Sequence, residues 1–228
     1  MARGAAQSRK RPQQQQKPKP TRKQQSWEDQ LFFSRLRRHA KWMFVLLAAV
    51  FAVGFVAFGV GLGGLEAEHP PEPYEDVFEL ARSEGLASVP HAGEVAGPPS
   101  VRGALEELGA DRIRHGIRAV EDPGLLREIV DRRVVLDVCP ISNLRTRVVG
   151  SLEEHPLPKL LAAGARCSIS TDDPAMFGTD LSRDYEAAAQ LGLDPRTAYD
   201  AGLEGALCDQ PTKSRLKEIG DSFDWQIP

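Results

Sequence analysis

The stretch His91-Ala92-Gly93-Glu94 comes just after the apolar run Leu86-Ala87-Ser88-Val89 and places an imidazole and a carboxyl group across a glycine-containing turn. Later strand-like runs also end in residues capable of chemistry, which are His115, Cys139 and the pair Asp172-Asp173. In repeated βα units, functional groups gather at the carboxyl ends of the strands. The sequence therefore predicts that these side chains meet in one site.

Helix and strand signals alternate on both sides of this stretch. Strands are expected at residues 86–90, 112–117, 134–138 and 166–170, and helices at 75–83, 100–108, from Pro123 onward and at 157–163. Only helices are expected after residue 181, at 181–191, 195–207 and 212–219. Strands that alternate with helices at this spacing predict parallel βα units, and hence an α/β fold.

Each site signal has a purely structural interpretation as well. A single histidine at a strand end is often a hydrogen-bonded structural residue, and Asp172-Asp173-Pro174 alone is typical of a helix-capping turn. The three cysteines, Cys139, Cys167 and Cys208, have no C-x-x-C spacing, so we expect reduced, buried thiols rather than a disulfide or a zinc knuckle. A histidine together with a carboxylate is nevertheless a suitable ligand pair for zinc.

The N-terminal part has a different composition. Residues up to Lys41 include 12 Lys and Arg against 2 Asp and Glu, while the rest of the chain has 17 against 30. We expect a disordered basic tail at residues 1–26, without specific nucleic-acid recognition, and an amphipathic juxtamembrane segment at 27–41. The charge-free run 42–64 is long enough to cross a bilayer, and its basic flank predicts a single-pass membrane protein with a cytoplasmic N-terminus. The alternative is that the end of this run is a barrel strand and that the protein is cytoplasmic.

Four motifs together carry a resemblance to a known family. They are His91-Ala92-Gly93-Glu94, Arg112-Ile113-Arg114-His115-Gly116, Cys139-Pro140-Ile141-Ser142-Asn143 and Ser170-Thr171-Asp172-Asp173-Pro174. In this order they resemble the second half of the adenosine deaminase family, from about residue 61 to the C-terminus. The resemblance implies that residues 65–228 are the C-terminal half of a (β/α)8 TIM-type barrel with extra C-terminal helices. It also implies zinc-dependent hydrolytic deamination of adenosine or a related aminopurine nucleoside.

The resemblance also implies a role for individual residues. His91 and Asp172 match zinc ligands, and Glu94 matches the residue that protonates the purine ring. His115 matches the histidine that orients and deprotonates the attacking water, and Asp173 matches a carboxyl that hydrogen-bonds the purine. Arg114 stands where glycine is more usual in the family, which suggests a different nucleoside such as aminodeoxyfutalosine.

One expected motif is missing from the sequence. The family's first strand carries a His-x-His pair that supplies two further zinc ligands, and this chain has no such pair. The zinc site implied by the resemblance is therefore incomplete in this chain. Two alternatives to an enzyme remain open, a non-enzymatic single-pass membrane protein and the product of a truncated or misjoined gene. The H-x-E and P-C-x-x-C signature of the other zinc deaminase class is absent, and the sequence carries no signal for the oligomeric state.

Overall fold

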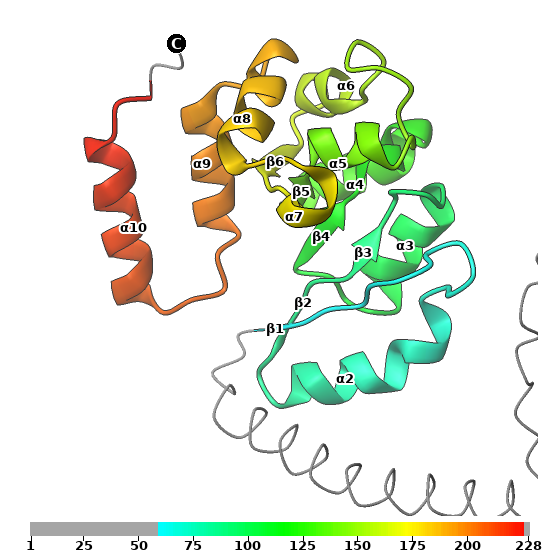
Figure 1. The fold of residues 1–228 in the computed structure, drawn as a ribbon. Coiled ribbons are helices and arrows are strands. Elements are labelled where there is room, and N and C mark those ends of the chain that lie inside the picture. The colour runs from blue at the N-terminus through cyan, green and yellow to red at the C-terminus, as the bar shows by residue number, and fades with distance from the viewer. Residues whose placement is uncertain (1–58, 226–228) are drawn as a thin grey trace, which may run out of the picture. The chain divides into compact units, whose positions relative to one another are not determined.

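The computed structural model describes residues 59–225 (Figure 1). The segments predicted at 1–26 and 27–41, and most of the segment 42–64, lie outside the described residues. Within the described part, no helix has both the length and the apolar character needed to span a membrane. The end of the predicted membrane segment is not helical, because Gly59–Val60 form strand β1 and residues 61–64 are irregular. This end overlaps a barrel strand, which was the alternative that the sequence left open.

The centre of the fold is a parallel sheet. Its strands are β3 (His91–Ala92), β4 (Arg112–His115), β5 (Val135–Val138) and β6 (Arg166–Ile169), in the order β3-β4-β5-β6. Strand β1 pairs in parallel with β2 (Ala87–Ser88). The amides of Val89 and His91 donate to the carbonyls of Val60 and Leu62, so this pairing continues up to the start of β3. The strands therefore follow one another in chain order, as in a series of βα units.

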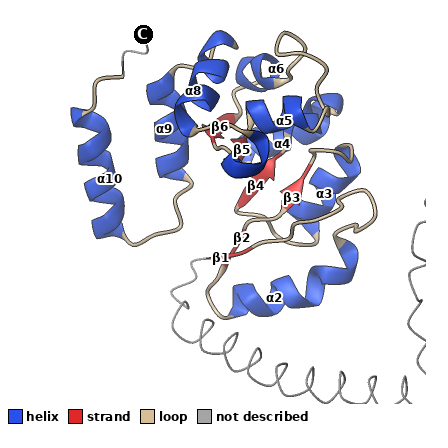
Figure 2. Cartoon of the chain, in the orientation of Figure 1, coloured by secondary structure: helices blue, strands red, loops and turns tan. Residues whose placement is uncertain are grey.

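Helices alternate with the strands along the chain (Figure 2). They are α2 (Glu75–Ser83), α3 (Pro98–Glu106), α4 (Pro123–Asp131), α5 (Pro140–Arg145) and α6 (Leu157–Ala162), with 3-10 turns at Glu72–Tyr74 and Ile117–Glu121. Proline stands at the first or second position of most of these helices, where its missing N–H leaves no hydrogen bond unmade. The long helices and the strands β4, β5 and β6 lie where the sequence predicts them, and α5 was not predicted.

The core forms between the strands and these helices. Ile113 of β4, Leu136 of β5 and Cys167 of β6 point to the same face because side chains alternate along a strand, and each is at most 2% exposed. They pack with Leu125 and Ile129 of α4, which are also fully buried. Burial of one such side chain stabilises the fold by roughly 1.5–3 kcal/mol.

The C-terminal helices follow β6. They are α7 (Pro174–Phe177), α8 (Leu181–Gln190), α9 (Pro195–Glu204) and α10 (Gln210–Ser222). Helix α9 packs against β6 and β5 (Figure 1). Close approach is possible because the facing positions Gly202 and Gly205 lack side chains; a Cβ at Gly205 would come within 2.9 Å of Val135. The architecture is an α/β fold consistent with part of a TIM barrel, with extra C-terminal helices as predicted.

Candidate active site

His91 stands at the start of β3, at the carboxyl edge of the pairing with β1. Its Nδ1 lies 2.8 Å from the carbonyl oxygen of Leu62. Because a carbonyl can only accept, Nδ1 carries the proton and Nε2 keeps a free lone pair. This hydrogen bond orients the ring, as a hydrogen bond to the nitrogen that does not bind the metal usually does in metal-binding histidines. The loop that supplies it passes close to the ring, since a Cβ at Gly63 would meet His91 at 3.3 Å.

Glu94 is held in a tight turn directly after β3. Gly93 has a φ of 70°, and a Cβ there would lie 2.4 Å from Val101. The Glu66 carboxylate accepts hydrogen bonds from the four successive amides of residues 93–96 and from the Ser100 hydroxyl. Glu66 was not predicted from the sequence, because it lies in a turn outside any helix or strand. Glu66 fixes the backbone that carries Glu94.

His115 ends strand β4, beside His91. The register pairs Ala92 with His115, and the two imidazole rings have centroids 5.4 Å apart. His115 is 1% exposed and has a φ of 64°, a conformation that non-glycine residues adopt rarely and mostly at functional sites. Its Nε2 lies 3.6 Å from Oε2 of Glu94. The two residues that the sequence predicted as catalytic therefore face each other.

The electrostatics of this pair favour neutral forms. Burial, with help from the charges of Asp172 and Glu66, raises the pKa of Glu94 to about 7. The Thr146 hydroxyl opposes this rise. Burial lowers the pKa of His115 to about 4, and the neighbouring His91 contributes. Glu94 Oε1 is buried and has no hydrogen-bond partner among the described residues. A carboxyl group that can hold or release a proton near neutral pH suits general acid–base catalysis.

Asp172 follows β6 and completes the cluster. It has a φ of 57°, and its Oδ2 accepts a hydrogen bond of 2.6 Å from the Ser142 hydroxyl. Nitrogen and oxygen atoms of His91, His115 and Asp172 lie within 4.8 Å of one another and form a possible metal site. His91 and Asp172 fit a metal ion best, because each has one atom held by the protein and another left to bind.

Asp173 does not join this cluster. Its Oδ1 accepts from the Met176 amide at 2.8 Å and caps α7, and the side chain is exposed. The structural interpretation of Asp172-Asp173-Pro174 as a capping turn is thus confirmed for Asp173. Cys139 and Cys167 are buried as expected, and burial raises the pKa of both thiols. Cys208 is half-buried.

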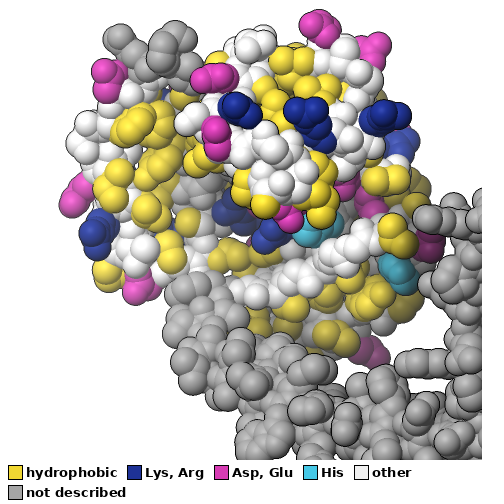
Figure 3. Space-filling model, in the orientation of Figure 1, with side chains coloured by type: hydrophobic (Ala, Val, Ile, Leu, Met, Phe, Trp, Pro, Cys, Tyr) yellow, Lys and Arg dark blue, Asp and Glu magenta, His cyan; other side chains and the backbone are white. Residues whose placement is uncertain are grey.

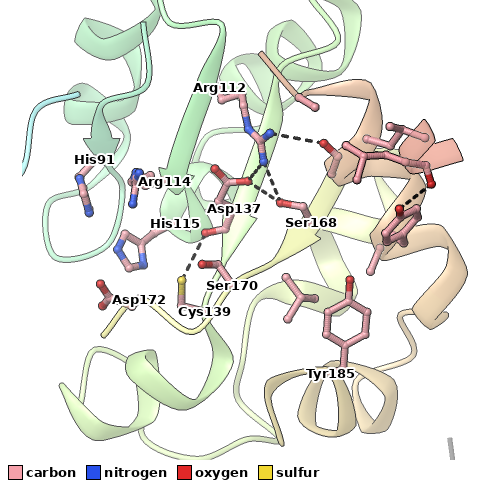
Figure 4. Close-up of a pocket in the computed structure, with 17 residues that line it drawn as sticks. His91, Arg112, Arg114, His115, Asp137, Cys139, Ser168, Ser170, Asp172 and Tyr185 are labelled. Carbon is pink, nitrogen blue, oxygen red and sulfur yellow. Dashed lines mark hydrogen bonds and ion pairs between the residues drawn. The ribbon is translucent and has the colours of Figure 1, made fainter. Parts of the chain in front are cut away.

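A cavity of about 320 Å³ opens beside the cluster (Figure 4). On the sheet side it is lined by His91, Arg114, His115 and Asp172, and on the other side by side chains that include Tyr185 of α8 and Leu203 of α9. The Arg114 side chain is exposed. Histidine and basic side chains gather in a hollow near the centre of the face drawn in Figure 3. The cavity is large enough for a small-molecule ligand.

A second polar group lies deeper along the same wall. The guanidinium of Arg112 donates to the Asp137 carboxylate, and to the hydroxyl of Ser168 at 3.3 Å (Figure 4). It also donates to the backbone carbonyl of Gly202 at 3.4 Å, which connects α9 to the sheet. No role for Arg112 was predicted from the sequence. Its contacts indicate that it holds α9 against the strands.

Comparison with known proteins gives a consistent picture. The adenosine deaminase family model matches residues 35–221. Relatives include an aminodeoxyfutalosine deaminase from Acidothermus cellulolyticus, 50% identical over 174 residues that make up 73% of this chain and 49% of the relative. An adenine deaminase from Chelativorans sp. is 41% identical over 72% of this chain and 53% of its own length. The chain spans about half the length of these relatives.

Solved structures agree. The crystal structure of adenine deaminase from Arthrobacter aurescens matches with a TM-score of 0.70 and 31% identity, over 77% of this chain and 55% of that one. A zinc-bound amidohydrolase from Burkholderia ambifaria matches with a TM-score of 0.67 and 27% identity, over 72% and 47% of the two chains. The family match begins at residue 35 and runs through residues 42–64, so the comparisons do not support an unrelated membrane segment there. The chain belongs to the adenosine deaminase family.

Proposed function

We propose that this chain carries the deaminating residues of a hydrolase that replaces the amino group of an aminopurine nucleoside with oxygen and releases ammonia. The observation that carries the proposal is the Glu94 carboxyl group. It has a pKa of about 7, lies 3.6 Å from His115 and keeps one buried oxygen without a partner among the described residues. An aromatic ring resists attack by water until a ring nitrogen gains a proton, and Glu94 is suited to supply it.

The reaction balances with these side chains. Glu94 gives a proton to the purine ring nitrogen and takes one back from the water that attacks the amino-bearing carbon. His115 faces the same space and orients the water, whereas Asp173, which caps α7 and does not line the cavity, has no part in this step. The second proton of the water leaves with the amine as ammonia. The products are the oxo-purine nucleoside and ammonia, and no oxidant or reductant is required.

The metal would be held by His91 and Asp172. A zinc ion bound there would activate the attacking water as a Lewis acid. His91 presents a free Nε2 because Nδ1 is used by Leu62, and Asp172 is oriented by Ser142. A catalytic zinc site commonly has three protein ligands. We therefore propose that a complete site needs at least one donor beyond His91 and Asp172.

The substrate proposed first is aminodeoxyfutalosine. The 50% identical relative bears that name, whereas the adenine and adenosine deaminases from Chelativorans sp. and Serratia proteamaculans are 41% and 42% identical. Arg114, which departs from the family's usual glycine, lies on the wall of the cavity and is exposed. An exposed guanidinium at this place suits a nucleoside with a polar or anionic substituent better than free adenine.

The test is a comparison of three substrates. The full chain, loaded with zinc, is incubated with aminodeoxyfutalosine, adenosine and adenine, and ammonia release is measured. We expect the fastest ammonia release with aminodeoxyfutalosine. Glu94→Gln should lower the rate of ammonia release at least a hundredfold, whereas Glu79→Gln, which changes an exposed glutamate of α2, should leave it unchanged. Absence of ammonia with all three compounds would contradict the proposal for this chain by itself.

A further inference from the structure

Three buried polar side chains extend from the site into the core. They are His115 at the end of β4, Asn143 of α5 and His155 in the loop before α6, with exposed fractions of 1%, 0% and 3%. Asn143 Nδ2 lies 3.4 Å from His115 Nδ1, and Asn143 Oδ1 lies 3.2 Å from His155 Nε2. At the far end, the backbone amide of Leu157 donates to His155 Nδ1 at 3.1 Å.

The Leu157 amide sets the direction of every hydrogen bond in this row. A backbone N–H can only donate, so His155 Nδ1 has no proton and Nε2 carries it. Burial lowers the pKa of His155 to about 4, so the ring is neutral at neutral pH. Its Nε2–H donates to the carbonyl oxygen of Asn143, and the Asn143 amide then donates to His115 Nδ1.

The opposite orientation of the Asn143 amide is excluded. With the amide reversed, its NH2 group would donate to His155 Nε2 while Leu157 donates to Nδ1. Nε2 of His155 could accept from that NH2 group only if the ring were an imidazolate anion in a buried environment, whereas in the neutral ring Nε2–H would face the NH2 group and neither donor would have an acceptor. Such an anion is far too costly to form at neutral pH. The row therefore has one arrangement of donors and acceptors.

We propose that Asn143 and His155 are positioning residues that hold His115 in the Nε2–H tautomer, so that His115 presents a hydrogen-bond donor to the site. His91 has the opposite tautomer, because its Nδ1–H faces Leu62. The two neighbouring rings thus offer different atoms, a lone pair from His91 and an N–H from His115. His91 is thus suited to bind a metal ion, and His115 is suited to donate a hydrogen bond to an oxygen atom.

The consequence for the reaction rests on the proposed function. A His115 Nε2 that already carries a proton orients the attacking water by donating a hydrogen bond to its oxygen. The same nitrogen does not take a proton from that water. The proton goes instead to Glu94, whose Oε2 lies 3.6 Å from His115 Nε2. The family resemblance assigned to this histidine both the orientation and the deprotonation of the attacking water. The hydrogen bonds through Asn143 and His155 are compatible only with orientation.

The tautomers are tested by long-range 1H–15N correlation spectra of the metal-free full chain, labelled with 15N-histidine, at pH 7.5. We expect His115 and His155 to carry the proton on Nε2 and His91 to carry it on Nδ1. Exposed His69 is the control and should show a mixture of both forms. A proton on Nδ1 of His115 in the wild-type chain would overturn the proposal.

Two variants make the test specific. In Asn143→Asp both carboxylate oxygens accept, so His115 should switch to the Nδ1–H form while His155 and His91 stay unchanged. In His155→Leu nothing fixes the Asn143 amide, so His115 should show both forms. Ser142→Ala, on the same helix, is the matched control and should leave the His115 tautomer as it is. A His115 that keeps only the Nε2–H form in both Asn143→Asp and His155→Leu would also refute the proposal.

This experiment is independent of catalysis. The spectra need neither substrate nor zinc, so the expected tautomers stand even if the chain releases no ammonia. Conversely, the wrong tautomer in a chain that deaminates normally would remove the positioning role and leave the proposed function intact.

Discussion

The turn after β3 that carries Glu94 requires a glycine at position 93. It has a φ of 70°, and a Cβ at this position would lie 2.4 Å from Val101, a contact that real side chains do not make. Gly178 has a similar φ of 60°, but a Cβ there would have no atom within 4 Å. Substitution of these two glycines therefore distinguishes the cost of backbone strain, which is common to both, from the cost of steric overlap, which is expected only at Gly93.

We expect Gly178→Ala to lower the free energy of unfolding by about 1–2 kcal/mol, which is the cost of a left-handed alanine. Gly93→Ala should cost about 1–3 kcal/mol more, because Val101 must also move. Urea denaturation of both variants measures the difference. Equal losses in the two variants would show that the turn at Gly93 adapts to a side chain.

Glu66 is the second residue on which the turn depends. Its carboxylate accepts from four successive amides, three of them through Oε2 at 2.7–3.1 Å. In Glu66→Gln the charge is lost and an NH2 group faces amide donors, so we expect a loss of about 1–3 kcal/mol. Amide hydrogen exchange at residues 93–96 should become faster, and Glu68→Gln, at an exposed position, should leave it unchanged. Unchanged exchange in Glu66→Gln would mean that the turn holds without this carboxylate.

Sequence patterns located the candidate site residues better than the residues that support them. His91, Glu94, His115 and Asp172 lie in or just after strands, and strand ends can be located from apolar runs. Glu66 supports the site from an irregular segment, and neither periodicity nor a short motif marks such a residue. No role for His155 was predicted from the sequence, because its contact with Asn143 exists only after α5 and the following loop have packed.

At the scale of elements, α5 connects much of the site. Its six residues carry Ser142 and Asn143, which contact Asp172 and His115. The helix is too short for an apolar period to appear in the sequence, so it was not predicted. Asp184 of α8 anchors the first turn of α5, because its Oδ1 accepts a hydrogen bond from the Ile141 amide at 3.0 Å. Its Oδ2 accepts a hydrogen bond from the Thr179 hydroxyl at 2.9 Å.

Asp184→Ala should lower the free energy of unfolding by about 1–3 kcal/mol, because the Ile141 amide and the Thr179 hydroxyl lose their acceptor in a buried place. Asp184→Asn keeps an acceptor and should cost less. Burial raises the pKa of Asp184, so the folded chain binds this proton more tightly than the unfolded chain does. Stability of the wild type relative to Asp184→Asn should therefore increase as the pH falls toward that pKa. Denaturation curves at several pH values measure this trend, and a decrease on acidification would contradict it.

At the scale of the whole molecule, alternation of helices and strands predicted the parallel sheet but not the position of α9. Its contact with the inner strands depends on Gly202 and Gly205 and on the Arg112 guanidinium, which are tertiary features. The membrane-helix prediction was wrong at residues 59–64. An apolar run without charges looks the same in a buried parallel strand as in a membrane helix, and here its end pairs with β2.

The proposed metal ligands come from opposite sides of the four-stranded sheet, so metal binding should stabilise the whole fold. His91 lies in β3, the first strand of that sheet, while Asp172 follows β6, the last. An unfolded chain does not hold these side chains within 4.8 Å of one another, so zinc should bind the folded chain preferentially. At a free zinc concentration of 100 times the Kd, the free energy of unfolding should rise by about 2.7 kcal/mol.

Thermal unfolding with and without zinc measures this effect. His91→Ala removes the ligand whose lone pair is already oriented, and it should abolish most of the zinc-dependent increase in Tm. His69→Ala changes an exposed histidine outside the cluster and should retain that increase. An equal response of both variants would place the zinc elsewhere in the chain. Because the measurement needs no substrate, it separates the ability of these residues to bind a metal from their ability to deaminate a nucleoside.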